Sequence, residues 1–378
     1  MQKIHNYQML ASHNGHHEHF RIFTKMPLMI FLRLYLLLLV VSLWLGCHNS
    51  ALDALGLPSP IVKISSAPGP EDLALDTFEN RHRVILSTAV RRTQKGLPRA
   101  GGRIQYLPVP GDTVYTFSIT GYMDSIYPHG IDLARWDDTL YLFVISHNAT
   151  VKDPSDFNRH LILQFRVTDD HLIWKHTWES PFLKAPNDLF VTDDGRIYVS
   201  NYLKRISTFQ TLWSALFRFR TGSIVYYLPG EGWNKLPGRY GYPNGVYVSR
   251  QHLYVAEGTR KRVLRFNLDA AGHPQPAPVT SPKMFLFADN LMPGPEGWLY
   301  GTCHPFPLKF KAHAADGTKI SPSWLFRIHP DLADWEWIGK DDGSNISAAS
   351  TCLPYRDTLY VGQVFQPYIL KLPFQNHR

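Results

Sequence analysis

The sequence predicts an all-β protein, a six-bladed β-propeller, on two observations. The 28 Pro and 26 Gly are spread along 378 residues, which favours many turns and short strands over long helices. An apolar strand centred on Tyr also recurs after a turn. Its centres are Tyr141, Tyr198, Tyr254, Tyr300 and Tyr360, with a sixth strand centred on Ile85, at intervals of 46 to 60 residues. A period of about 50 residues with three or four strands per repeat is typical of a propeller, not of a β-sandwich.

The N-terminal segment is expected to direct export or to anchor the chain. Residues 29–46 are strongly apolar and are interrupted only by Arg33. The segment ends in Leu-Gly followed by Cys47, which resembles a bacterial lipoprotein cleavage box, although that box prefers a smaller residue at Leu45. A lipid-anchored protein and an uncleaved membrane anchor both remain open. We interpret residues 1–47 as a signal peptide or membrane anchor, 48–60 as a linker and 61–378 as a propeller on the non-cytosolic face.

Polar residues stand directly ahead of the first strand of most repeats, where we expect them to face the central channel. They are Glu71, Asp72, His129, Asn187, Asp188, Asn244, Asp289 and Asn290. Buried oxygens are costly unless something pairs with them, and calcium accepts several carboxylate and carboxamide oxygens. A ring held by hydrogen bonds alone is the alternative. Zinc is not favoured, because His and Cys are a minority in the ring.

These residues carry a family resemblance. The motifs "PEDL", "PHGI", "SHNA", "PNDL", "PNGV", "ADNL" and "GTCHP" follow one another between residues 69 and 373. In this combination the chain resembles the paraoxonases, which are calcium-dependent arylesterases and lactonases. The resemblance implies a six-bladed propeller whose central tunnel holds two calcium ions, one catalytic and one structural.

The resemblance also implies a role for each matching residue. The ligands of the catalytic calcium would be Glu71, Asn187, Asn244, Asp289 and Asn290, and those of the structural calcium Asp72, Asp188 and the main-chain carbonyl of Ile131. His129 would act as the general base, supported by His147. The alternative for both histidines is a hydrogen bond to a neighbouring backbone carbonyl. His304 is interpreted as a structural or wall residue.

The expected function is therefore calcium-dependent hydrolysis of aryl esters or lactones, in which a metal-polarised carbonyl is attacked by water. No Gly-x-Ser-x-Gly motif supports a serine hydrolase. The alternative is a non-catalytic, calcium-stabilised propeller that acts as a binding or scaffold module. The chain lacks the cysteines that join the chain ends in vertebrate members, so we expect strand pairing to close the ring. Tyr202-Leu203 replaces the usual Asp-His, so substrate preference is not expected to carry over.

One segment predicts a helix at the tunnel mouth. Residues 204–220 place apolar side chains near helical spacing with basic residues at both ends, which suits a short lid helix or a helix in a membrane interface. Together with the N-terminal segment, it predicts association with a membrane surface or lipid. The formal charge of +8 has no dense Lys/Arg block, so no nucleic-acid partner is expected.

Overall fold

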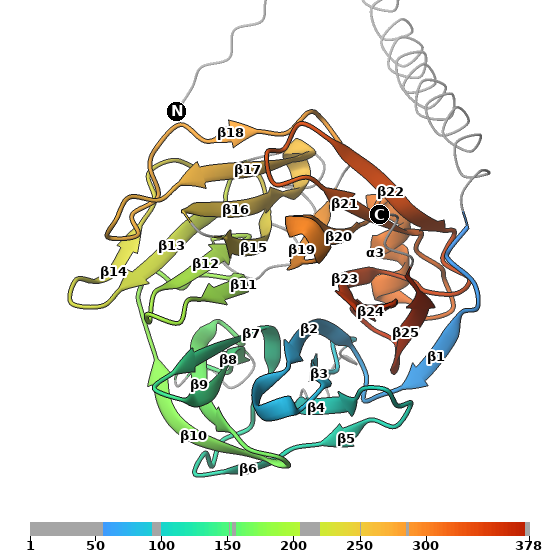
Figure 1. The fold of residues 1–378 in the computed structure, drawn as a ribbon, viewed down its shortest axis with the longest axis horizontal. Helices are drawn as coiled ribbons and strands as arrows, with labels where there is room; N and C mark the ends of the chain where they lie inside the picture. Colours follow the sequence, from blue (N-terminus) through green and yellow to red (C-terminus); the bar gives the residue numbers. More distant parts are fainter. Residues whose placement is uncertain are drawn as a thin grey trace, which may run out of the picture. The chain divides into compact units, whose positions relative to one another are not determined.

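The computed structural model describes residues 56–92, 100–150, 152, 156–204, 220–249, 251–284 and 287–374. Residues of the propeller unit form six sheets arranged in a ring around a central axis (Figure 1). Five sheets have four strands and one has five. The prediction of an all-β, six-bladed β-propeller is confirmed.

Each blade is an antiparallel meander whose first strand lies nearest the axis. The first blade contains β2 (Pro70–Asp76), β3 (Arg83–Thr88), β4 (Arg103–Pro108) and β5 (Tyr115–Thr116). The second contains β7 (Pro128–Trp136), β8 (Thr139–Asn148), β9 (Arg159–Val167) and β10 (His171–Trp178), with β6 (Ser118–Thr120) parallel to β10. The third contains β11 (Pro186–Val191), β12 (Ile197–Asn201), β13 (Ser223–Leu228) and β14 (Gly232–Lys235).

The remaining blades follow the same order. The fourth contains β15 (Pro243–Ser249), β16 (His252–Glu257), β17 (Arg262–Asn267) and β18 (Val279–Thr280). The fifth contains β19 (Ala288–Pro293), β20 (Leu299–Cys303), β21 (Ser323–Ile328) and β22 (Trp335–Asp341). The sixth contains β23 (Ala349–Tyr355), β24 (Thr358–Gln363), β25 (Tyr368–Pro373) and β1 (Val62–Ser65). The helical elements are α3 (Pro307–Ala315), η2 (Phe78–Asn80), η3 (Gly258–Arg260) and η4 (Pro295–Gly297).

The recurring Tyr-centred strands are the second strands of the blades, and the sixth centre, Ile85, lies in β3. Packing between blades explains why the residue recurs. Tyr198 of the third blade donates a hydrogen bond of 2.8 Å to the carbonyl of Gly272 in the fourth. Tyr254 of the fourth blade donates one of 2.9 Å to the carbonyl of Pro330 in the fifth. The rings fill the space between sheets, and each hydroxyl reaches the next blade, so burial costs no unpaired polar group.

Strand pairing closes the ring, as predicted. β1 pairs antiparallel with β25, so that Val62 lies opposite Lys371 and Ser65 opposite Tyr368. The first strand of the propeller thereby completes its last blade. Cys303 and Cys352 are buried and free, so no disulfide joins them. Cys47 lies outside the described residues.

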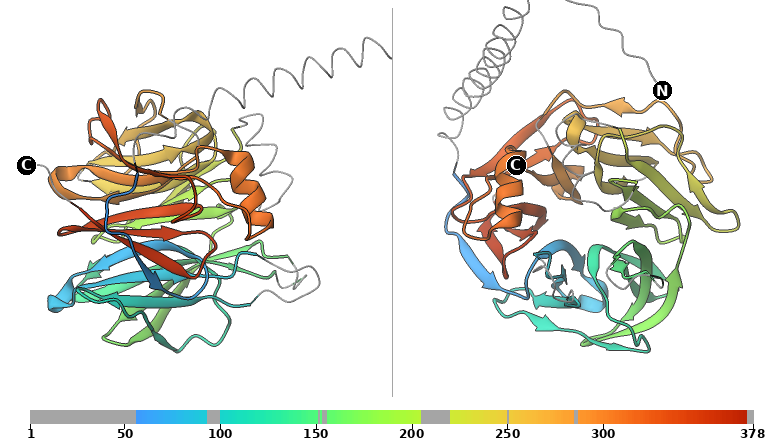
Figure 2. Two further views of the ribbon diagram at one scale, coloured as in Figure 1. Left: turned by 90° about the vertical axis from the view of Figure 1, so that its right-hand side faces the viewer. Right: turned by 180° about the vertical axis from the view of Figure 1, so that it is seen from behind.

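Several predictions concern segments outside the described residues. These are the signal or anchor segment at 1–47, most of the linker at 48–60 and most of the helix predicted at 204–220. Within the described ranges, no helix combines the length and the apolar character needed to cross a membrane. The α-helix that is described, α3, lies on one face of the propeller, and the connection from β2 to β3 lies on the opposite face (Figure 2).

Candidate metal centre and active site

The predicted polar residues come together at the start of the inner strands. They lie inside the strands, not ahead of them as the sequence predicted: the second and third positions of β2, β7, β11, β15, β19 and β23 hold Glu71-Asp72, His129-Gly130, Asn187-Asp188, Asn244-Gly245, Asp289-Asn290 and Ser350-Thr351. At this point the register of every inner strand with its neighbour shifts. Such an irregularity takes residues out of the ladder and re-aims them. It therefore gathers polar residues where the six inner strands begin: a pair in four blades, and His129 or Asn244 followed by a glycine in the other two.

The sixth blade contributes hydroxyl groups, which the sequence analysis missed. Ser350 and Thr351 both donate to the main-chain carbonyl of Glu71, the latter at 2.7 Å. Thr351 Oγ1 also lies 3.1 Å from Asp72 Oδ1. Their position in the repeat was the available signal, but a search for acidic and amide residues passes over Ser and Thr.

In the first four blades, aspartate and glycine alternate at the third position. Asp72 Oδ2 accepts the N–H of Ile131 in the next blade at 2.7 Å, and Asp188 Oδ2 accepts that of Val246 at the same distance. The residue before each donor is a glycine. A Cβ added to Gly130 would lie 2.8 Å from Asp188 Cα. The close approach of the second and third blades therefore depends on the missing side chain of Gly130.

The carboxylates of Asp72 and Asp188 are buried, and the partly buried carboxylate of Asp132 is close enough to be affected by their charge. Burial raises the pKa of Asp72 to about 7 and that of Asp188 well above its usual value, with added repulsion from neighbouring carboxylates. Asp132, which the sequence analysis did not select, accepts the N–H of Val191 at 2.7 Å, and burial raises its pKa to about 8. None of the three has a cationic partner among the ion pairs of the described residues. Their ionised forms require a positive charge.

The two carboxylates of the predicted catalytic set carry partners from this chain. Arg91 Nη2 donates to Glu71 Oε2, and His129 Nε2 lies 3.1 Å from Glu71 Oε1. Burial acts to raise the pKa of Glu71, but Arg91 and His129 outweigh it and bring the pKa to about 2. His304 Nε2 lies 2.9 Å from Asp289 Oδ2, while burial raises the pKa of Asp289. His304 thus contacts a predicted ligand and does more than line a wall.

Two carboxamide oxygens test whether a hard cation fits. Asn244 Oδ1 and Asn290 Oδ1 are buried and have no hydrogen-bond partner. Asn290 uses its nitrogen instead, donating to Asp72 Oδ1 at 2.8 Å and to Thr351 Oγ1 at 3.1 Å. An unpaired buried acceptor is costly, and a cation such as calcium accepts carboxamide oxygens as ligands. The donor set therefore fits calcium.

A preformed cluster of three charged or imidazole ligands is not required for that fit. Within the described ranges, no group of three or more His, Cys, Asp or Glu side chains is arranged to hold a metal ion. The predicted catalytic set contains only two carboxylates, Glu71 and Asp289, because its other members are asparagines. Carboxamides are three of its five ligand residues.

A chain of three histidines leads away from Glu71. His129 Nδ1 lies 2.8 Å from His147 Nε2, and His147 Nδ1 lies 2.9 Å from His160 Nδ1. Successive rings are almost perpendicular, at 88° and 89°. The structure brings His129 and His147 together as predicted and adds His160, which pairs with His147 across β8 and β9. Burial lowers the pKa of His160 to about 4 and keeps it neutral near pH 7.

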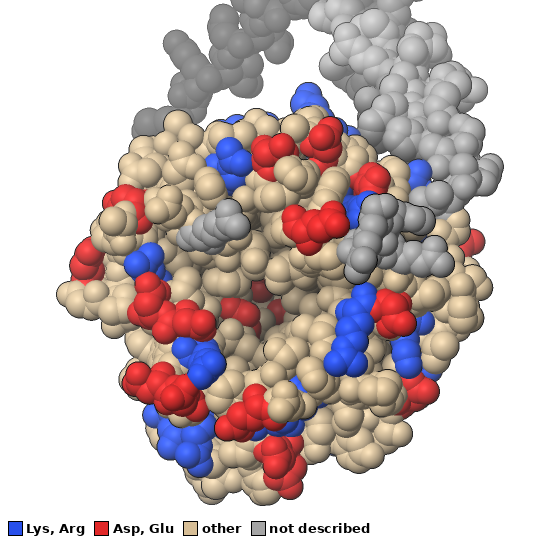
Figure 3. Space-filling view, in the orientation of Figure 1, with Lys and Arg blue, Asp and Glu red and all other residues tan. Residues whose placement is uncertain are grey.

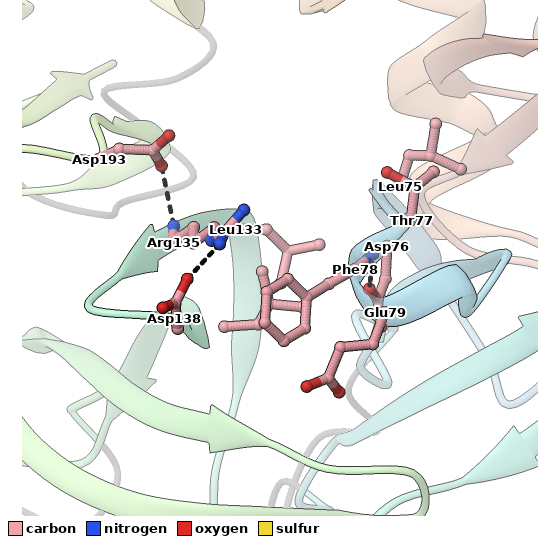
Figure 4. Close-up of a pocket in the computed structure, with 10 residues that line it drawn as sticks. Leu75, Asp76, Thr77, Phe78, Glu79, Leu133, Arg135, Asp138 and Asp193 are labelled. Carbon is pink, nitrogen blue, oxygen red and sulfur yellow. Dashed lines mark hydrogen bonds and ion pairs between the residues drawn. The ribbon is translucent and has the colours of Figure 1, made fainter.

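A separate cavity opens where the inner strands end. It has a volume of about 580 Å³ and is lined by Leu75, Asp76, Thr77, Phe78, Glu79, Leu133, Arg135, Asp138, Leu140 and Asp193 (Figure 4). None of the predicted metal or catalytic residues lines it. The face seen in Figure 3 is hollowed near the centre, with acidic side chains at the bottom of the hollow. Because the polar pairs lie where the inner strands begin, we place the candidate chemistry at the other end of the axis.

Comparison with known proteins decides the family. The arylesterase family model matches residues 100–370, which is more than half of this chain. The chain belongs to the arylesterase family. This membership supports a hydrolase of esters or lactones. Glu71 and Asp72 lie before the matched segment, so their place in the site rests on the geometry described above.

Individual relatives of this arylesterase-family protein are distant. It is 26% identical over 254 residues to serum paraoxonase/arylesterase 2 of Gallus gallus, covering 64% of this chain and 67% of the relative. The Homo sapiens protein of the same name is 25% identical over 258 residues, with the same coverage. The resemblance to the paraoxonases is therefore confirmed at the level of the family.

Solved structures share the fold. A gluconolactonase from Xanthomonas campestris superposes with a TM-score of 0.52 and 17% identity, over 87% of this chain and 93% of that one. Regucalcin, a calcium-binding protein from Agrobacterium tumefaciens, superposes with a TM-score of 0.51 and 14% identity, over 84% of this chain and 95% of that one. Similarity at this level of identity concerns the propeller architecture.

Proposed function

We propose that this protein is a calcium-dependent hydrolase of aryl esters, lactones or both. The observation that carries the proposal is the pair of buried, unpartnered oxygens of Asn244 and Asn290, which stand at the start of inner strands β15 and β19 as Glu71 stands at the start of β2. Membership of the arylesterase family and the structural similarity to regucalcin, a calcium-binding protein, are consistent with it.

Two sets of residues would hold two calcium ions. The catalytic ion would be held by Glu71, Asn187, Asn244, Asp289 and Asn290, and the structural ion by Asp72, Asp188 and the carbonyl of Ile131. Bound at the first set, calcium would polarise the carbonyl of an ester or lactone and stabilise the negative charge that develops on its oxygen. Bound at the second set, it would neutralise aspartates whose burial otherwise opposes ionisation.

His129 would act as the general base. Its Nδ1 lies 2.8 Å from His147 Nε2 and its Nε2 lies 3.1 Å from Glu71 Oε1, so Nε2 would take a proton from water when calcium has Glu71 as a ligand. Nε2 lies on the same side as Glu71, a proposed ligand, so a water activated there would stand beside the polarised carbonyl. His147 lies between His129 and His160 and would orient His129. The bond from the carbonyl carbon to the alcohol or phenol oxygen would then break, and that oxygen would take back a proton. The other product would leave as a carboxylate.

The pocket wall supports a distinct substrate preference. Tyr202 packs against Tyr242 with ring centroids 5.1 Å apart. Desolvation, followed by the charges of Tyr202, Asp289 and Glu71, raises the pKa of Tyr242 well above its usual value. Tyr242 stands two residues before Asn244, so this aromatic pair would line the site. Aromatic walls favour an apolar or aromatic acyl or leaving group.

Export and membrane association also remain proposals. They rest on the apolar run at 29–46, on Cys47 and on the composition of 204–220. Fractionation of cells that express the chain tests them: a soluble cytosolic protein would contradict both.

The experiment that tests the proposed function measures hydrolysis of phenyl acetate and a δ-lactone by the full chain, with calcium and with EGTA. Turnover that depends on calcium supports the proposal. A folded protein that binds calcium and turns over neither substrate would instead favour the non-catalytic binding or scaffold module.

A further inference from the structure

Arg91 holds an unusual position at the proposed metal site. The side chains of Arg91 and Glu71 are only 10% and 8% exposed, and Nη2 of Arg91 donates to Glu71 Oε2. The guanidinium also reaches the carbonyl of Pro128, with Nη2 at 3.3 Å and Nη1 at 3.4 Å. Its Nε is buried without a hydrogen-bond partner. A full positive charge is therefore fixed directly on a proposed calcium ligand.

Both carboxylate oxygens of Glu71 are occupied by this chain. Arg91 contacts Oε2, while His129 Nε2 lies 3.1 Å from Oε1. In contrast, the partner of Asp289, the other carboxylate of the proposed catalytic set, is the imidazole of His304. Arg91 is thus the permanently charged group at this site, because a guanidinium stays protonated at any working pH.

We propose that Arg91 is an internal counter-ion that competes with calcium for Glu71. This inference rests on the proposed function. A divalent cation that takes Oε2 as a ligand must displace Nη2 or lie close to a guanidinium in a site with little water. Like charges at such distances repel strongly, more so when they are buried. Arg91 therefore weakens calcium binding at the catalytic set. When no metal is bound, it neutralises the charge of Glu71 and so keeps the site folded.

The neighbouring Arg92 provides a matched control. Arg92 carries the same charge one residue further along, but it faces α3: its Nε and Nη2 donate to the carbonyl of His313 at 3.1 and 2.9 Å. Its guanidinium also lies over the ring of Phe365, 4.4 Å from the centroid. Arg92 contacts none of the proposed ligands in the described hydrogen bonds. Arg92→Gln therefore removes one positive charge without touching Glu71.

The test is a calorimetric titration of calcium chloride into the full chain, solubilised in detergent and stripped with EGTA. Arg91→Gln is expected to tighten one binding step by at least about tenfold, because the competing buried charge is gone. Arg92→Gln is expected to change every step by less than about twofold, because its charge is further away and better screened. Unchanged or weaker calcium binding by Arg91→Gln would overturn the inference.

Two further variants guard against misfolding and indirect effects. Arg91→Lys keeps the charge but lacks the planar fork that spans Glu71 and Pro128, so its affinity should lie between those of the wild type and Arg91→Gln. Affinity at or below that of the wild type would contradict competition. In a Glu71→Gln background, Arg91→Gln should tighten calcium binding much less than it does in the wild type, because the ligand for which Arg91 competes is gone. A tightening of the same size in that background would also overturn the inference.

The titration separates this inference from the proposed function. A folded wild-type protein that binds no calcium would refute both. Calcium binding by the wild type, with no tightening in Arg91→Gln, would refute the role of Arg91 and leave the proposed hydrolase intact.

Discussion

The Nδ1 atoms of His147 and His160 lie 2.9 Å apart. A neutral imidazole has one donor and one acceptor nitrogen, so one ring must donate to the other. The same constraint applies between His147 and His129, whose nitrogens lie 2.8 Å apart. The tautomer of His160 therefore determines which nitrogen of His129 carries a proton. His160, which contacts His147 and not the proposed base His129, therefore controls whether His129 can accept a proton.

His160→Gln is expected to lower kcat for phenyl acetate by about tenfold or more, with little change in KM, since it disturbs the orientation and tautomer of the base but not the binding of substrate. The measurement is steady-state kinetics with saturating calcium. His176→Gln, at an exposed position of β10, is the matched control and should behave like the wild type. Equal kcat values for His160→Gln and wild type would show that His160 only fills space.

The pH dependence of stability reports on Asp132. Its pKa is raised to about 8 in the folded protein from 3.8 in the unfolded chain. Between these values the unfolded chain releases a proton that the folded protein keeps, so the contribution of Asp132 to stability is lost as the pH rises towards 8. In EGTA, Asp132→Asn should therefore stabilise the protein more at pH 8 than at pH 5. Thermal melts at the two pH values measure the difference.

Asp342→Asn is the control for that experiment. Asp342 is exposed and accepts the N–H of Ser344 at 2.9 Å, and its hydrogen bonds to Ser344 lower its pKa, so it is ionised at both pH values. Its substitution should shift the melting temperature equally at pH 5 and pH 8. A larger gain for Asp132→Asn at pH 5 would reverse the sign of the proposed linkage.

Gly130→Ala tests the close approach of the second and third blades. The added Cβ would lie 2.8 Å from Asp188 Cα and 2.6 Å from the carbonyl oxygen of Asn187. Backbone atoms cannot move away cheaply, so we expect a loss of roughly 1–3 kcal/mol in the free energy of unfolding, measured by urea denaturation. Gly101→Ala is the control, because its nearest contacts of 3.5 Å are ordinary. An unchanged free energy of unfolding for Gly130→Ala would mean that the strands separate easily.

The repeat made the propeller and much of the site predictable from sequence. Tyr198 and Tyr254 each donate a hydrogen bond to the next blade, and the apolar strand that holds the Tyr in five blades leaves a period in the sequence. The polar pairs share one position in that period, so their convergence at the axis followed from the repeat. Their burial follows from the shifted register of the inner strands, which the sequence does not display.

The missed residues depend on relationships that have no period. His160 belongs to the histidine chain because β8 and β9 pair it with His147, and one residue of slip would turn it away. Arg91 lies in the connection after β3, and the alternation of apolar and polar residues along strands does not predict the path of a connection. Asp132 stands two residues beyond Gly130 and matches no other blade, where apolar residues take its place.

The most direct test of the account compares the full chain with Asn244→Ala in hydrolysis of phenyl acetate and a δ-lactone, with calcium and with EGTA. Asn244 Oδ1 is buried without a hydrogen-bond partner, so truncation removes a proposed ligand and breaks no hydrogen bond of that atom. The account predicts turnover by the wild type that EGTA abolishes, and a folded Asn244→Ala protein that needs at least about tenfold more calcium or has lost activity. Wild-type turnover that persists in EGTA, or Asn244→Ala activity with an unchanged calcium requirement, would contradict it.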